Sequence, residues 1–199
     1  MEKQQVRLHL TGDSLIARHE GCDHPMVNDC LNQLADFPLE IINTAVSGHN
    51  TADLLARLDQ EILSQAQVDF VCILIGANDL ASHKQIHLPT FEDNLKQIIK
   101  KLTRIYEPEQ ITLISPPPVD ESKQWHRTNQ RIREYSTCMK QIAFQENCRF
   151  IDLYKTFTEN PKPTEELLIG SLNDGLHFGK AGYELLAQTI LESLDLFGN

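Results

Sequence analysis

The sequence contains no long hydrophobic stretch and few of the residues that mark secreted scaffolds. No run of roughly 18 apolar residues occurs, which argues against a membrane-spanning helix. The first residues, Met-Glu-Lys-Gln-Gln-Val, carry no apolar signal region, so we expect a cytoplasmic protein. The five cysteines are an odd number and include no Cys-x-x-Cys pair, which argues against a disulfide framework or a zinc site. Cys72 lies inside an apolar run and is predicted to be a buried small hydrophobe.

Basic residues are also scarce. Lysine and arginine number 18 against 28 aspartates and glutamates, for a formal net charge of −10. Such a surface repels phosphate backbones and anionic lipid headgroups, so a nucleic-acid partner is not expected. The charges are dispersed, and no repeat, linker or low-complexity segment divides the chain. The 199 residues suffice for one domain spanning 1–199, and the sequence leaves the oligomeric state open.

Apolar segments of two periodicities alternate along the chain. Five segments predict strands, at Val6–Leu10, Leu39–Val46, Val68–Ile75, Ile111–Ser115 and Arg149–Tyr154. Segments with helical spacing or helix-forming composition predict helices at Pro25–Phe37, Thr51–Gln65, Thr128–Asn147 and Ala181–Phe197, and another capped by Thr90 that runs to Tyr106. We therefore predict an α/β fold, a flavodoxin-like three-layer α/β/α sandwich with a five-stranded parallel sheet.

In such a fold, ligands bind beyond the carboxyl ends of the strands. Three short clusters follow predicted strands, at Gly12-Asp13-Ser14, Ser47-Gly48 and Gly76-Ala77-Asn78-Asp79, and a fourth, Asn173 to His177, precedes the terminal helix. A serine hydroxyl becomes a good nucleophile when a histidine takes its proton and a carboxylate orients that histidine. Ser14, His177 and Asp174 supply these three groups. We therefore take them as the candidate catalytic residues.

Acyl transfer also needs donors for the oxyanion of the tetrahedral intermediate. The backbone N–H groups of Ser14 and Gly48 and the side-chain amide of Asn78 are our candidates. Each motif alone has an ordinary structural explanation: Gly-Asp-Ser and Asp174-Gly175 occur in turns, and Asn78-Asp79 is typical of a helix cap. Their order and their shared position at strand ends favour one site.

At this point the sequence resembles the GDSL (SGNH) hydrolase family. Thr11-Gly12-Asp13-Ser14-Leu15 is similar to its first block, Gly48 falls in the second, Gly76-Ala77-Asn78-Asp79 matches the third, and Asp174-Gly175-Leu176-His177 matches the fifth. A narrower likeness, to the isoamyl-acetate-hydrolysing esterase branch, rests on Leu74–Asp79, Ile114–Glu121 and Asp174–Phe178. Ala45 departs from the pattern, since the family often has glycine there.

The resemblance implies a serine esterase or acylhydrolase that acts on a small-molecule ester through an acyl-enzyme. It implies a shallow, flexible site and neither a metal nor a cofactor. In the family, Asp13 supports the loop rather than acting as a base. The acyl group and the alcohol are not fixed by the resemblance.

Several alternatives remain open at this stage. A thioesterase or lysophospholipase would use the same triad, although no long apolar lid is evident, and a sugar O-acetyl ester is another possible substrate. Trp125 and His126 are candidates to line the leaving-group side, and the alternative for Trp125 is to anchor its own loop. A phosphate or nucleotide binder lacks both G-x-x-x-x-G-K-[ST] and G-x-G-x-x-G. A phosphatase with Asp13 as nucleophile would need further acidic metal ligands, for which Asp79 is one candidate. A non-catalytic binding module would have no use for the complete triad.

Overall fold

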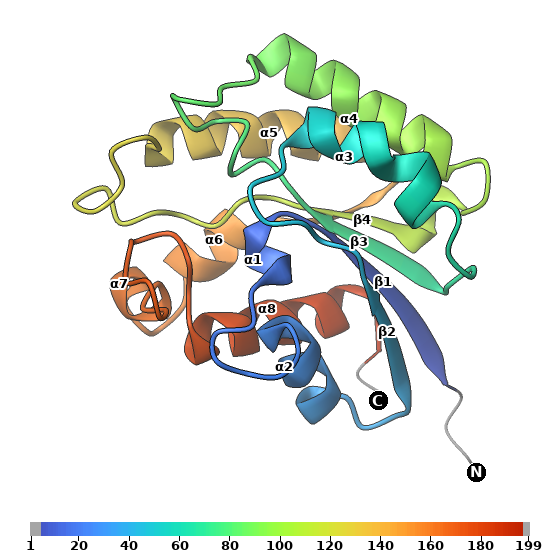
Figure 1. Ribbon diagram of the computed structural model, residues 1–199, viewed down its shortest axis with the longest axis horizontal. Coiled ribbons are helices and arrows are strands. Elements are labelled where there is room, and N and C mark those ends of the chain that lie inside the picture. The colour runs from blue at the N-terminus through green and yellow to red at the C-terminus, as the bar shows by residue number, and fades with distance from the viewer. Residues whose placement is uncertain (1–4, 197–199) are drawn as a thin grey trace.

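The computed structural model describes residues 5–196 and contains one sheet of five parallel strands (Figure 1). The strands are β1 (Val6–Gly12), β2 (Leu39–Asn43), β3 (Phe70–Leu74), β4 (Ile111–Ile114) and β5 (Arg149–Ile151). Their order across the sheet is β2-β1-β3-β4-β5. This is the flavodoxin-like order, and the predicted fold class is confirmed. The chain reverses direction of winding next to β1, which places a ligand-binding crevice beyond β1 and β3.

Helices cover both faces of the sheet, as Figure 1 shows. One layer comprises α3 (Thr51–Arg57), α4 (Leu88–Leu102) and α5 (Asn129–Gln145), and the opposite layer contains α2 (Met26–Leu34) and α8 (Lys180–Ser193). Shorter helices are α1 (Ser14–Ala17), α6 (Leu153–Thr158) and α7 (Thr164–Leu167), with a π-helical turn at Leu58–Ile62 and a 3-10 turn at Pro108–Gln110. Within residues 5–196, no helix combines the length and apolarity needed to cross a membrane.

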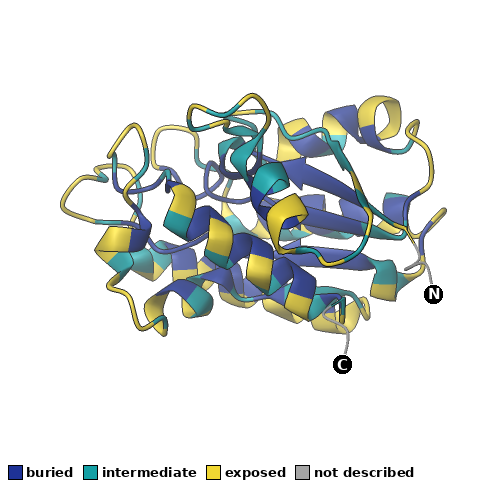
Figure 2. Ribbon diagram, turned by 90° about the horizontal axis from the view of Figure 1, so that it is seen from below, coloured by how far each residue is buried: buried dark blue, intermediate teal, exposed yellow. Residues whose placement is uncertain are grey.

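The core lies between the sheet and these two helix layers. The central strands β3 and β4 are almost entirely buried, because helices cover them on both faces, whereas the helices expose their outer sides (Figure 2). Cys72 on β3 is fully buried, as predicted, and all five cysteines are free.

Several predicted boundaries were wrong for identifiable reasons. The strand predicted to run to Tyr154 ends at Ile151, because the Asp152 side chain accepts a hydrogen bond from Lys155 N and begins α6. Helix α4 begins at Leu88 rather than after Thr90, since Pro89 is tolerated in a first helical turn. The second strand ends at Asn43, whose Oδ1 accepts from Ala45 N in a turn.

Two helix predictions also need correction. The helix expected over Thr51–Gln65 is α-helical only to Arg57 and then widens into the π-helical turn. The terminal helix ends at Ser193, and the predicted end at Phe197 lies outside the described residues. Neither change moves the elements that carry the candidate site.

Candidate active site

The first cluster lies where β1 ends and α1 begins. Gly12 has φ 145°, and a Cβ atom there would lie 1.8 Å from the carbonyl oxygen of Leu74, so only glycine permits this close approach of β1 and β3. Asp13 caps α1, its Oδ1 accepting a hydrogen bond from Leu15 N at 2.9 Å. Ser14 is the first residue of the helix, at the carboxyl edge of the sheet. The tight strand-to-helix turn thus presents the Ser14 hydroxyl to the crevice.

The fourth cluster meets this serine from the far end of the chain. His177 Nε2 lies 2.8 Å from Ser14 Oγ, and His177 Nδ1 lies 2.7 Å from Asp174 Oδ2. Asp174 Oδ1 also accepts from the backbone N–H groups of Leu176 and His177, at 3.0 and 2.9 Å. The structure therefore brings together the three residues that the sequence analysis singled out as a triad.

Hydrogen bonding determines how this triad is protonated. Burial by itself raises the pKa of Asp174, but the hydrogen bonds from His177 and Leu176 outweigh it and leave that pKa below its ordinary value. An ionised carboxylate only accepts, so the proton of a neutral imidazole must be on Nδ1. Nε2 then carries a free lone pair directed at the Ser14 hydroxyl.

The other two clusters border the same cleft. Gly48 adopts φ 85°, a left-handed turn conformation that favours glycine. Asn78 is 5% exposed, and its Nδ2 donates to the carbonyl of His49 at 2.9 Å, which leaves its second N–H available. No described acceptor takes the backbone N–H of Ser14 or of Gly48. The three candidate oxyanion donors thus lie around one cleft with unused N–H groups.

That cleft has a volume of about 370 Å³ and is predominantly polar. It is lined by Ser14, Arg18, Ser47, Gly48, Asn78, Lys84, Arg127, Asp174, Leu176 and His177. All five predicted site residues are among them. Leu176 is the one aliphatic side chain in this lining.

Arg127 is a site residue that the sequence analysis missed. Its guanidinium donates to the carbonyl of Ala77 at 2.7 Å, to Asn78 Oδ1 at 3.1 Å and to Gln124 Oε1 at 3.0 Å. Gln124 Nε2 in turn donates to the carbonyl of Asp174 at 2.6 Å. This network joins the loop after β4 to both the amide donor and the triad acid. Its members occur at no diagnostic spacing, so only the folded loop reveals it.

Two neighbouring acids hold the loops in place. Asp79 is fully buried and accepts from the N–H and the hydroxyl of Thr51, at 3.0 and 2.5 Å, which fixes the start of α3. Asp13 is also fully buried. Neither is exposed to the cleft, and no group of three potential metal ligands occurs among residues 5–196. The structure thus gives the proposed phosphatase nucleophile and its metal ligand no access to a substrate.

Trp125 was predicted to line the leaving-group side or to anchor its loop. Its side chain is 88% exposed and does not line the cleft. The loop is fastened instead by its neighbour His126, which packs on His83 with ring centroids 4.3 Å apart and whose Nδ1 lies 3.1 Å from Ser82 Oγ. Both expectations for Trp125 were wrong.

The fold and this cleft together define an α/β protein with a Ser–His–Asp relay beside amide donors. Residues 10–185 match the model of the GDSL-like lipase/acylhydrolase family. A solved lipase/acylhydrolase from Enterococcus faecalis superposes with a TM-score of 0.83 at 31% identity, over 95% of each chain. The protein therefore belongs to this family and is a carboxylic ester hydrolase of the GDSL type.

Curated relatives are more distant. An isoamyl acetate-hydrolyzing esterase of Saccharomyces cerevisiae is 27% identical over 80% of this chain and 70% of the relative. An acetylxylan esterase of Geobacillus stearothermophilus is 25% identical over 80% and 74%. The structure of the acetylxylan esterase Axe2 from the same organism has a TM-score of 0.74 at 21% identity, covering 95% of this chain and 94% of that one, which supports the fold.

Proposed function

We propose that this protein hydrolyses small carboxylic esters through an acyl-enzyme on Ser14. His177 Nε2 takes the hydroxyl proton while Ser14 Oγ attacks the ester carbonyl, and the protonated imidazole then gives that proton to the departing alcohol. Water, activated by the same nitrogen, attacks the acyl-enzyme and releases the carboxylic acid. Asp174 holds the imidazole and stabilises its charged form. The observation that carries this proposal is the pair of contacts made by the His177 ring. Its Nε2 lies 2.8 Å from Ser14 Oγ, and its Nδ1 lies 2.7 Å from Asp174 Oδ2.

Three N–H donors stabilise the negative charge of the tetrahedral intermediate. These are the backbone N–H groups of Ser14 and Gly48 and the second N–H of Asn78. They are neutral and already oriented, so they require no rearrangement as the charge develops. Arg127 supports this arrangement by holding Asn78 Oδ1, which directs the amide nitrogen toward the cleft.

The cleft favours a short acyl group over a fatty acyl chain. A long chain needs a continuous apolar wall, whereas this lining offers one aliphatic side chain among polar and charged groups. The two named relatives act on acetate esters, which agrees with this choice. A lysophospholipase activity is therefore disfavoured, and we propose acetyl and similarly short esters as substrates.

The test is hydrolysis of p-nitrophenyl esters of increasing acyl length by the wild type and Ser14→Ala. We expect the acetate to be turned over fastest, and Ser14→Ala to lower kcat by a factor on the order of 10⁶. A Ser64→Ala variant, which changes an exposed serine outside the cleft, is the matched control. If Ser14→Ala keeps the wild-type activity, or a fluorophosphonate labels another residue, Ser14 is not the nucleophile. A preference for long acyl chains would overturn the short-ester assignment alone.

A further inference from the structure

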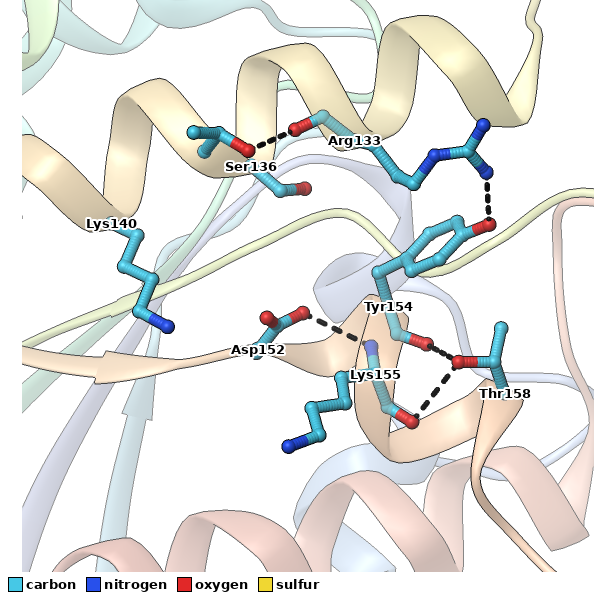
Figure 3. A pocket seen from close by; sticks show the side chains of 8 residues that line it. Arg133, Ser136, Lys140, Asp152, Tyr154, Lys155 and Thr158 are labelled. Atoms are coloured by element: carbon cyan, nitrogen blue, oxygen red, sulfur yellow. Dashed lines mark hydrogen bonds between the residues drawn. The ribbon is translucent and has the colours of Figure 1, made fainter.

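A second pocket, separate from the Ser14 cleft, lies between α5 and α6. Its volume is about 420 Å³, and it shares no lining residue with that cleft. Figure 3 shows Arg133, Ser136 and Lys140 on α5 across from Asp152 and Tyr154 at the start of α6. Lys155 of α6 also lines the pocket, and its side chain extends away from α5 in this view. The esterase mechanism uses none of these residues.

The pocket concentrates positive charge in an acidic protein. Three cations line it against one carboxylate, whereas the whole chain carries a net charge of −10. Lys140 has no carboxylate within ion-pair distance among the described residues, and Arg133 donates to the hydroxyl of Tyr154 at 2.8 Å. Lys155 has only a long, exposed contact with Glu159, at 3.8 Å, and such pairs contribute little. Lys140 and Lys155 thus remain available to an anion, whereas Arg133 is held against Tyr154.

The carboxylate in the pocket is already partly engaged. Asp152 Oδ1 accepts from Lys155 N at 3.0 Å as the cap of α6. One carboxylate does not neutralise three cations, so the lining has an excess of positive charge. The second oxygen of Asp152 accepts no hydrogen bond from the described residues, so it can accept one from a hydroxyl group of a ligand.

Ser136 gives an independent indication of a ligand. Its side chain is 6% exposed, and its hydroxyl oxygen is buried without a hydrogen-bond partner in the described structure. Such a group is costly unless something satisfies it. Ser136 lies on the side of α5 that lines the pocket, so a rotation about its Cα–Cβ bond turns the hydroxyl toward an occupant (Figure 3).

We propose that this pocket binds the phosphate group of a small phosphate monoester. A phosphate carries nearly two negative charges and several strong acceptor oxygens, which match Lys140, Lys155 and the Ser136 hydroxyl. The Tyr154 ring provides an adjacent wall for the carbon skeleton, and the volume admits a phosphate with a small polyol attached. The site lies outside the catalytic cleft and does not depend on the esterase assignment.

The test is an NMR titration of the whole protein with inorganic phosphate at constant ionic strength. We expect saturating amide shifts confined to residues 133–140 and 152–158, with a Kd on the order of 1 mM. The double variant Lys140→Ala/Lys155→Ala should weaken binding by about tenfold or more. The double variant Lys162→Ala/Lys180→Ala has the same net charge, changes lysines outside the pocket and should bind as the wild type does.

Ser136→Ala separates a ligand contact from a structural role. Since the hydroxyl makes no hydrogen bond in the protein, its removal should leave the free energy of unfolding unchanged or higher. Phosphate affinity should nevertheless fall several-fold. Shifts that do not saturate by about 20 mM phosphate would overturn the proposal. So would shifts centred on Ser14 and His177, or equal affinity in the Lys140→Ala/Lys155→Ala variant.

Discussion

The buried acid beside the nucleophile makes a strong and measurable prediction. Asp13 is fully buried, and burial raises its pKa from 3.8 to about 7, against the opposing hydrogen bond from Leu15 N. The charge of Asp79 adds to this rise, and that of Arg127 opposes it. The Asp13 carboxyl group is therefore protonated in the folded protein at pH values where it is ionised in the unfolded chain.

The sign of the effect on stability follows from proton linkage. Between pH 3.8 and about 7 the folded state binds the proton and the unfolded state does not. The contribution of Asp13 is thus fully present below pH 3.8 and is lost as pH rises to about 7. At 1.36 kcal/mol for each pKa unit, the free energy of unfolding lost through Asp13 over this whole pH range is about 4 kcal/mol. About 2–3 kcal/mol of that loss occurs between pH 5 and pH 8.

Asp13→Asn tests this reasoning, because asparagine keeps an acceptor for Leu15 N and cannot ionise. From pH 5 to pH 8, the free energy of unfolding of the variant should rise by about 2–3 kcal/mol relative to wild type, as measured by urea titration. The fixed cost of burying the new amide N–H cancels in this comparison. The contribution of the buried His9 cancels as well. Its pKa is lowered to about 4, so it makes the stability of both proteins rise with pH by the same amount.

The exposed Asp23 supplies the control, since Asp23→Asn should show no such pH-dependent difference. If the stability difference between Asp13→Asn and wild type stays constant from pH 5 to pH 8, Asp13 is already ionised at low pH in the folded protein. That outcome would refute the linkage argument.

Three further predictions concern catalysis. Asn78→Ala should lower kcat by about 10²–10³-fold with little change in KM, and a silent variant would remove Asn78 from the oxyanion hole. Arg127→Ala should lower kcat by about 10–100-fold, because it loses charge-assisted hydrogen bonds to the Asn78 loop, and added guanidinium should restore part of the rate. Lys84 lines the cleft with its Nζ 3.3 Å from the Gly48 carbonyl. Lys84→Gln should therefore lower kcat/KM for 4-acetoxybenzoate about fivefold while sparing its methyl ester, and equal losses would exclude a charge effect.

The sheet could be predicted from the sequence because its strands are buried differently from its helices. Strand β3 is covered on both faces and appears as a nearly continuous apolar run, whereas α4 repeats its apolar residues at helical spacing. The short helices α1, α6 and α7 have too few turns to show any periodicity. Such helices begin at a capping side chain, as α6 does at Asp152. A single capping residue is too weak a signal to predict a helix from the sequence.

The meeting of the Ser14 cluster with the Asn78 cluster was predictable for a topological reason. Parallel strands end at one edge, so residues that directly follow β1 and β3 meet there, although 63 positions separate Ser14 from Ala77. No comparable rule predicts the contacts that hold these catalytic loops in place. Arg127 and Gln124 lie in an irregular loop, and each donates to a backbone carbonyl, a group that every residue possesses.

The reacting residues and the residues that hold them differ in how strictly the chemistry limits their type. The reacting groups of acyl transfer are chemically restricted, so a serine, a histidine and a carboxylate stand out by type. Groups that hold them need only reach a carbonyl or an amide, which arginine, glutamine and threonine all do. Asp79 on Thr51, Arg127 on Asn78 and Gln124 on Asp174 each tie one catalytic loop to another segment. Because each contact crosses between loops, its loss should displace a donor or the base without unfolding the sheet, and should appear in kcat before it appears in stability.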